Sequence, residues 1–100
     1  MNYYLQKIEE MHKKFGISNK DVGFTEEEKD FRITAIDEEL TEYSEAENRV
    51  DELDALVDLL IFTLGTVERM GLSNVFDEAF NRVMKANMTK EIGPLQKRNN

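Results

Sequence analysis

The stretch LDALVDLLIFTLG, residues 53–65, constrains the fold more than any other, because it is almost entirely aliphatic yet carries Asp54 and Asp58. Residues four apart lie on the same side of a helix. On a helical wheel the aliphatic residues form one broad stripe at Leu53, Leu56, Val57, Leu60, Leu64 and Val67. The aspartates lie opposite this stripe, where Ile61 and Phe62 flank Asp58. A helix that is apolar nearly all round is normally buried, so we expect Asp58 to be partly desolvated and to need a partner or a metal ion.

The periodicity of apolar residues predicts an all-α chain of four or five helices with no strand. The four helices that we expect are Tyr3–Phe15, about Thr25 to Glu47, about Asp51 to Met70, and about Asn74 to Asn87. Gly16 and Gly71 are the expected stops of the first and third helices. The break between the second and third helices, near Asn48, is only weakly marked, because no glycine or proline lies there.

The start and the end of the helical region carry clearer signals. T-E-E-E at Thr25 is typical of a capping box, in which the Thr25 hydroxyl and Glu28 satisfy free backbone N–H groups. Gly93-Pro94 ends regular structure, so residues 93–100 are expected to be an irregular tail. One hundred residues argue for a single domain, residues 1–100, whose thin core favours assembly with further copies.

Composition excludes several classes of protein. The formal net charge of −8 argues against a general nucleic-acid binder, which needs a basic surface. No apolar run approaches the roughly 18 residues that span a bilayer, and the first residues lack the apolar core of a signal peptide. The absence of cysteine excludes disulfides and fits a reducing compartment, so we expect a cytoplasmic protein without membrane or nucleic-acid partners.

A second acidic cluster, EELTE at residues 38–42, lies on the predicted helix before the aliphatic stretch. Glu38, Glu39 and Glu42 share one side of that helix, opposite a stripe formed by Ile33, Ile36, Leu40 and Tyr43. Taken alone, such glutamates are more often a solvated face. If the second and third helices form an antiparallel hairpin, however, both acidic faces converge and repel each other unless cations neutralise them. Oxygen ligands without cysteine favour Mg²⁺ or Mn²⁺, with Ca²⁺ as an alternative.

These acids resemble the signature of the MazG-type all-α nucleotide pyrophosphohydrolases, particularly the short phage-type members. That signature is E-E-x-x-E on one helix and E-x-x-D on the next. Glu38-Glu39-x-x-Glu42 matches the first half, and Asp58 resembles the final aspartate of the second. The chain departs from the pattern at Ala55, three residues before Asp58, where the family has an acid. Asp54 comes four before and keeps the same face, and Asp51-x-x-Asp54 is another register.

Two further segments extend the resemblance. FDEAFNRVMKANMTK, residues 76–90, is similar to the family's downstream segment, which ends in an Asn-Met-x-Lys element at Asn87 and Lys90. EMHKKFG, residues 10–16, resembles the family's N-terminal Phe-His-x-x-Phe-Gly stretch, with Met11 in place of the first aromatic residue. The resemblance therefore covers most of the chain.

The resemblance implies a homodimer or dimer of dimers, built on an antiparallel helical hairpin, that hydrolyses a nucleoside triphosphate (NTP or dNTP) to the monophosphate and pyrophosphate. The implied metal ligands for Mg²⁺, with Mn²⁺ as the alternative, are Glu38, Glu39, Glu42, Asp54 and Asp58. Metal ions lower the pKa of bound water, and Glu38 or Glu39 is the expected catalytic base. The residues expected to bind substrate are Asn87, Lys90, Arg32 and His12.

Each substrate-binding candidate also has a simpler interpretation. His12 is more often a surface or packing residue, and Asn87 with Lys90 is also compatible with an ordinary helix end that favours a cation. Arg32 either pairs with an acid or reaches phosphate. Gly65, in mid-helix, costs roughly 1 kcal/mol against alanine, so close approach of a ligand or of another helix is expected there.

The sequence is also compatible with two other functions. One is a phosphoribosyl-ATP pyrophosphohydrolase, a close relative, which the Asn-Met-x-Lys end disfavours. The other is a non-catalytic helical interaction module whose acids only solubilise it or bind a basic partner.

Overall fold

The computed structural model describes residues 2–17 and 23–90, and this part of the chain is all-α, as predicted, with no strand. Its helices are α1 (Tyr3–Lys14), α2 (Glu26–Glu45), α3 (Arg49–Arg69) and α4 (Ser73–Met88). The expected helix ends agree with these bounds to within two residues. The tail expected at residues 93–100 lies outside the described part. No helix in the described part is long and apolar enough to cross a membrane.

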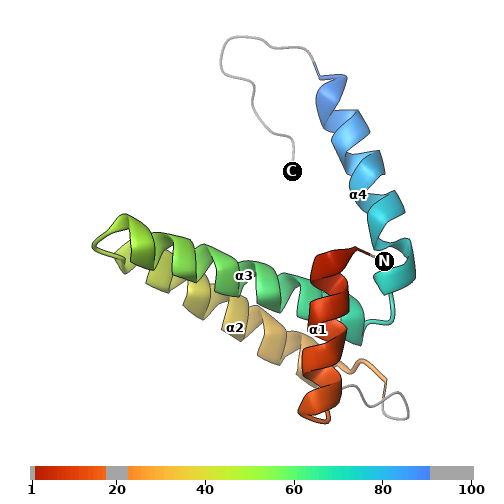
Figure 1. The fold of residues 1–100 in the computed structure, drawn as a ribbon, viewed down its shortest axis with the longest axis horizontal. Coiled ribbons are helices and arrows are strands. Elements are labelled where there is room, and N and C mark those ends of the chain that lie inside the picture. The colour runs from red at the N-terminus through yellow and green to blue at the C-terminus, as the bar shows by residue number, and fades with distance from the viewer. Residues whose placement is uncertain (1, 18–22, 91–100) are drawn as a thin grey trace.

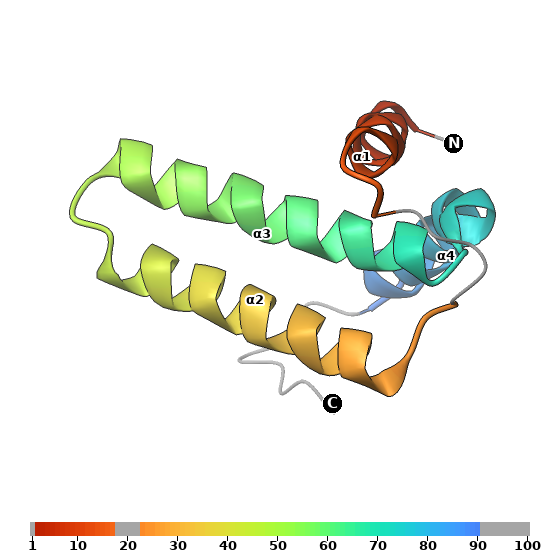
Figure 2. The same cartoon turned by 90° about the horizontal axis from the view of Figure 1, so that it is seen from below.

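Helix α3 is the centre of the molecule (Figure 1). It runs antiparallel to α2, and the two form the predicted hairpin (Figure 2). Helix α1 crosses α3 near the end of the hairpin that is opposite the α2–α3 turn. Helix α4 contacts α3 near their junction and then projects away from the hairpin (Figure 1).

Polar side chains begin the first three helices. Asn2 accepts a hydrogen bond from the Leu5 N–H at 2.8 Å at the start of α1. The Thr25 hydroxyl accepts from the Glu28 N–H at 3.1 Å at the start of α2, which is one half of the predicted capping box. Asn48 explains the break before α3, because its side-chain oxygen accepts from a backbone N–H, that of Asp51, at 2.9 Å.

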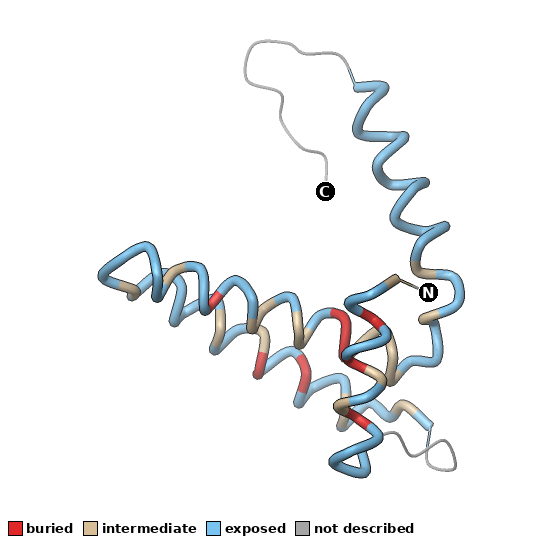
Figure 3. The backbone as a smooth tube through the Cα atoms, viewed as in Figure 1, coloured by how far each residue is buried: buried red, intermediate tan, exposed pale blue. Residues whose placement is uncertain are grey.

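The hydrophobic core is small and lies where α1 crosses α3. It consists of Leu5, Ile8 and Leu64, against which Met11, Ile61, Val67 and Phe76 pack. Figure 3 shows that buried positions gather at this crossing, whereas most of the hairpin and all of α4 are coloured as exposed or half-buried. A single chain therefore buries little apolar surface outside this crossing.

The aliphatic stripes of α2 and α3 are largely exposed in the single chain. Leu53 and Leu60 of α3 are 62% and 46% exposed, and Leu40 of α2 is 52% exposed. Ala35 of α2 and Ala55 of α3 are buried instead. Because alanine allows close approach of two helices, α2 and α3 pair through the sides that carry the acids, and their aliphatic stripes face outward.

Candidate functional site

Glu39 is the centre of the acidic cluster between α2 and α3. Its side chain is half-buried, and its Oε2 atom is fully buried without a hydrogen-bond donor. Asp58 on α3 is half-buried as well, whereas Glu38 and Glu42 are exposed. The antiparallel hairpin thus brings the acidic faces of both helices together, as the sequence predicted for these four residues.

The electrostatics of this cluster raise the pKa of Glu39 from its usual 4.5 to about 7. The largest cause is hydrogen bonding with the Glu42 carboxyl, followed by burial of Glu39 itself. The negative charges of Glu42, Asp58 and Glu38 add to the effect. Two neighbouring carboxylates resist simultaneous ionisation, so Glu39 keeps its proton up to about pH 7.

Asp54 lies further along the hairpin, towards the turn between α2 and α3. It lines a shallow groove together with Glu42, Glu45 and Asp51. The carboxylate of Asp51 accepts a hydrogen bond from the Asn48 side chain at 2.9 Å, which holds it at the start of α3. Asp51 and Asp54 thus line the same groove beside Glu42, and both registers that the sequence left open stay open.

The chemistry of the cluster suits a hard divalent cation. Every candidate metal ligand is a carboxylate oxygen. No group donates a hydrogen bond to the Glu39 Oε2 atom, and the raised pKa of Glu39 means that the cluster retains a proton up to about pH 7. Within residues 2–17 and 23–90, no three acidic or histidine side chains converge closely enough to hold a metal ion in the conformation observed. Glu38 and Glu42 are exposed beside Glu39 and Asp58, and their carboxylate oxygens are the type of ligand that such an ion prefers.

A pocket of about 680 Å³ lies beside the acidic cluster, between α1, α2 and α3. Its apolar walls are Met11, Ile17, Phe31, Ile61 and Phe62. Its polar residues are His12, Glu28, Arg32, Asp58 and Arg69. One pocket therefore joins an acid of the cluster to two arginines and a histidine.

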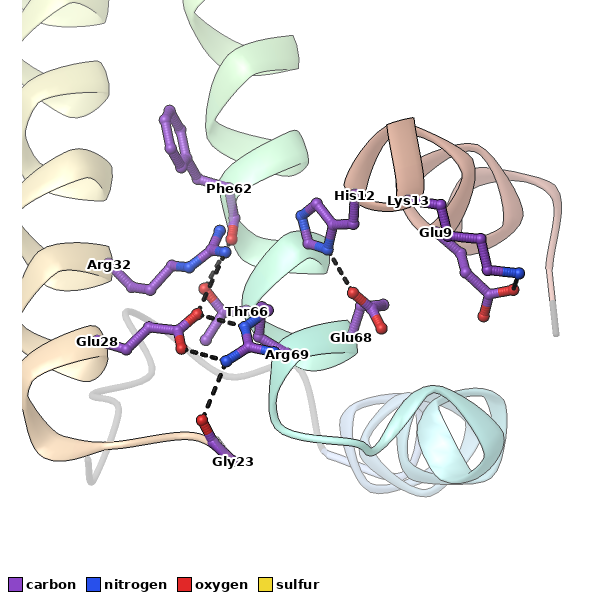
Figure 4. A network of polar contacts seen from close by, with 10 residues as sticks. All are labelled: Glu9, His12, Lys13, Gly23, Glu28, Arg32, Phe62, Thr66, Glu68 and Arg69. Atoms are coloured by element: carbon purple, nitrogen blue, oxygen red, sulfur yellow. Dashed lines mark hydrogen bonds and ion pairs between the residues drawn. The ribbon is translucent and has the colours of Figure 1, made fainter. Parts of the chain in front are cut away.

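The two arginines of the pocket share one carboxylate, that of Glu28 (Figure 4). Arg69 donates from Nε and Nη2 to its two oxygens, at 2.7 and 2.6 Å, and from Nη2 to the Gly23 carbonyl at 3.0 Å. Arg32 Nη2 lies 3.5 Å from the same carboxylate. The hydrogen bonds from Arg69 hold the pKa of Glu28 below its usual value. The Glu28 side chain is thus committed to the arginines rather than to a complete capping box.

His12 is buried, with 2% of its surface exposed, and its Nδ1 donates to the Glu68 carboxylate (Figure 4). A Cβ atom placed on Gly65 would lie 3.3 Å from His12 Nε2 and 2.9 Å from Arg32 Nη1. Close approach therefore explains the glycine, because the His12 side chain of α1 and the Arg32 side chain of α2 both lie close to the backbone of α3 at this position. His12 is therefore not a surface residue, which was one of the two simpler interpretations of the sequence.

The profile of the family described as phosphoribosyl-ATP pyrophosphohydrolase matches residues 8–87. The chain belongs to this family. The match confirms the predicted membership of the MazG-like all-α nucleotide pyrophosphohydrolases, which include this family. No curated protein and no solved structure matches the chain. The family assignment makes the chain a pyrophosphohydrolase that acts on nucleotides, and it disfavours a non-catalytic module.

Not every candidate lies at the pocket of this pyrophosphohydrolase. Arg32 and His12 line it beside Asp58. Asn87 lies in the last turn of α4 and Lys90 just beyond it, and both are exposed. Because α4 projects away from the hairpin, the chain does not bring these two residues to its own acidic cluster (Figure 1).

Sequence reasoning missed three residues of the pocket region, namely Glu28, Glu68 and Arg69. Glu28 was expected to act only as part of a helix cap. The signal that was available is Gly65, because a glycine in mid-helix indicates that other groups approach there, and Glu68 and Arg69 lie one turn beyond it on the same side of α3.

Proposed function

We propose that the protein hydrolyses a nucleoside triphosphate, ribo or deoxy, to the monophosphate and pyrophosphate. The observation that carries the proposal is the position of Glu39, whose buried oxygen lies among Glu38, Glu42 and Asp58 beside a pocket with aromatic and basic walls. A triphosphate is polyanionic and does not approach such a cluster unaided. The proposal therefore includes Mg²⁺, with Mn²⁺ as the alternative.

Glu38, Glu39, Glu42, Asp54 and Asp58 are the proposed metal ligands. When bound, the metal supplies charge neutralisation at the phosphoryl oxygens and a lower pKa for water. Glu38 or Glu39 then accepts the proton of the attacking water, since each lies on the face of α2 that borders the cluster. Asp58 lines both the cluster and the pocket, so it marks the end of the pocket at which phosphate is bound.

The proposed active unit is a homodimer, or a dimer of dimers. Outward-facing aliphatic residues on α2 and α3 support it, because Ile33, Leu40, Leu53, Leu56 and Leu60 are each at least 42% exposed. Helix α4 adds Phe80, Val83 and Met88, which have 53%, 60% and 78% of their surface exposed. If α4 of one subunit packs on the hairpin of the other, Asn87 and Lys90 bind the phosphates in the partner's site.

A phosphoribosyl-ATP substrate is the second candidate, and the description of the matched family favours it. Both reactions break a phosphoric anhydride and release pyrophosphate, so the acidic cluster serves either. The substrates differ in the ribose phosphate carried on the adenine base, which needs a further anion-binding group at the base end of the pocket.

A pyrophosphate-release screen tests the proposal. Ribo-, deoxy- and modified triphosphates and phosphoribosyl-ATP are each incubated with the protein and Mg²⁺, and released pyrophosphate is measured. We expect turnover of at least one triphosphate, with loss of turnover in Glu39→Gln and Asp58→Asn. Glu27→Gln, an exposed acid on the first turn of α2, is the matched control and keeps activity. Turnover of phosphoribosyl-ATP alone establishes the second candidate, and active Asp58→Asn protein contradicts both.

A further inference from the structure

The acidic cluster and Arg32 lie at two levels of the same hairpin. Arg32 precedes Glu39 by seven residues on α2, and Gly65, which Arg32 approaches, follows Asp58 by seven residues on α3. Because the helices are antiparallel, Arg32 and Gly65 both lie on the side of the acidic cluster that is away from the α2–α3 turn. Seven residues correspond to about 10 Å of helix. The pocket includes both Asp58 and Arg32, so it extends from the phosphate end to a second end two turns away. A nucleotide that has its phosphates at Asp58 has its base near Arg32.

Arg32 is a buried donor with unused capacity. Only 7% of its surface is exposed, and its Nε atom is buried without an acceptor. Its Nη2 atom is 3.5 Å from Glu28, whose two oxygens are already bound by Arg69 at shorter distances. A buried N–H group without an acceptor is costly, so this end of the pocket is suited to a ligand that supplies one.

The charges around Arg32 favour a neutral acceptor over a phosphate. Glu28 faces both arginines, and Glu68 acts on Arg69, so two arginines meet two glutamates and their formal charges cancel. The neighbouring walls are apolar and aromatic, with the Phe31 ring centroid 6.0 Å from the Arg32 guanidinium carbon and Phe62 opposite on α3. Flat apolar walls with one placed donor are typical of a pocket for a planar, acceptor-bearing ring.

We infer that Arg32 determines base specificity by donating a hydrogen bond to a carbonyl oxygen on the base edge. The pocket then favours 6-keto purines (guanine, hypoxanthine) and 4-keto pyrimidines (uracil, thymine) over the corresponding amino bases. An exocyclic amino group is itself a hydrogen-bond donor, so it cannot accept from Arg32, and both N–H groups stay unpaired. Gly65 provides the space for Arg32, and Glu28 with Arg69 positions it. The inference rests on the proposed nucleotide substrate.

The test compares matched keto and amino nucleotides on the wild type, Arg32→Gln and Arg32→Lys. The probes for hydrolysis are GTP against ATP and UTP against CTP, with their deoxy forms, scored by kcat/KM for pyrophosphate release. The probes for binding are the corresponding monophosphates, scored by Kd, which requires no turnover. Arg49→Gln is the matched control, because Arg49 lies on α3, is paired with Glu52 and has a side chain that is 93% exposed.

The expected result is a preference of about tenfold or more for the keto member of each pair in the wild type and in Arg49→Gln. In Arg32→Gln the preference falls to near unity, and Arg32→Lys recovers part of it at most, because lysine lacks the fixed Nε–H donor. A wild-type ratio near unity, or a ratio unchanged in Arg32→Gln, overturns the inference. If no triphosphate is hydrolysed but the monophosphates show the Arg32-dependent ratio, the proposed reaction fails and the base assignment stands. If no nucleotide binds, the base assignment fails as well.

Gly65→Ala is a second variant that leaves every pocket side chain in the sequence. The new Cβ atom would lie 2.9 Å from Arg32 Nη1, so the guanidinium must shift. We expect this variant to lose the keto preference while thermal unfolding shows a folded protein, since alanine favours helix. Thr63→Ala, at an exposed position on the same helix, is the control and keeps the preference. An unchanged preference in Gly65→Ala contradicts the role given to Arg32.

Discussion

Arg69 on α3 binds both carboxylate oxygens of Glu28 on α2, at 2.7 and 2.6 Å, and thereby joins residues 41 positions apart at the end of the hairpin opposite its turn. The turn end of the hairpin is closed by the chain itself, and Arg69 closes the other end. The same arginine donates to the Gly23 carbonyl, which ties the segment before α2 to α3. The pair therefore ties α2 to α3 at this end of the hairpin and holds the wall of the pocket beside Arg32.

Arg69→Met is expected to destabilise the protein by about 3 kcal/mol, because the Arg69 and Glu28 side chains are only 8% and 19% exposed and the carboxylate loses its two short hydrogen bonds. Urea unfolding gives the free energy. Arg49→Met breaks the exposed Arg49–Glu52 pair and serves as the matched control, with a cost below about 1 kcal/mol. Equal costs in both variants contradict the structural role assigned to Arg69.

The Glu28–Arg69 pair also predicts an acid-sensitive contribution to stability. The pKa of Glu28 is lowered in the folded protein, so below its usual 4.5 the unfolded chain binds more protons than the folded one. The contribution is fully present above pH 4.5 and is lost as the pH falls through the folded-state value. The difference in unfolding free energy between the wild type and Glu28→Gln is expected to shrink on acidification. A difference that is constant from neutral pH to about pH 3 is the contrary result.

Glu39 predicts the opposite pH dependence. Its folded-state pKa is about 7 against a usual 4.5, so between these values the folded protein binds more protons and its stability falls as the pH rises. In EDTA, Glu39→Gln is expected to be more stable than the wild type above pH 7 and close to it near pH 4.5. Mg²⁺ or Mn²⁺ is expected to raise the Tm of the wild type at pH 8 and to leave Glu39→Gln much less affected. A lower Tm for Glu39→Gln in EDTA at pH 8 rules out repulsion within the cluster.

The proposed dimer predicts complementation between inactive variants. Asp58→Asn removes an acid from one site, and Lys90→Ala removes the cation that the other subunit is proposed to supply. Each variant alone is expected to lose most pyrophosphate release, and mixing the two after unfolding and refolding restores part of it, because a mixed dimer has one intact site. If Lys90 acts within its own chain, no mixed dimer has an intact site and mixing restores nothing.

A companion variant tests the interface itself. Leu56→Glu places a charge on the exposed aliphatic side of α3, and light scattering after size exclusion is expected to report a monomer. Ser44→Glu, at an exposed polar position of α2, is the control that leaves the assembly intact. A wild-type protein that is itself monomeric at all concentrations contradicts the dimer.

The sequence predicted the helices well, and it predicted that the acids of each helix share one face, because both depend on local spacing. Thr25 marks a helix start by its own hydrogen bond, and Glu39 shares a face with its neighbours through the helical repeat alone. The packing direction of the hairpin was not predictable in this way. A helical wheel identifies the aliphatic side but does not say whether it is covered by the same chain or by another copy.

The pocket region escaped prediction for a different reason. Glu28 has two competing partners, the free N–H groups at its own helix start and the guanidinium of Arg69. The local partner is visible in the sequence, whereas the distant one depends on where the end of α3 lies. His12 is similar, because its burial against Gly65 follows from the crossing of α1 over α3.

Ala35 of α2 and Ala55 of α3 are the buried alanines of the hairpin, and they carry no charge and take no part in any proposed chemistry. Yet their methyl groups determine how far apart the two rows of acids stand. Any larger residue at either position would widen the gap for all of the facing carboxylates at once. If the cluster binds the proposed cation, the ionic radius that it accepts therefore depends on the size of two neutral side chains.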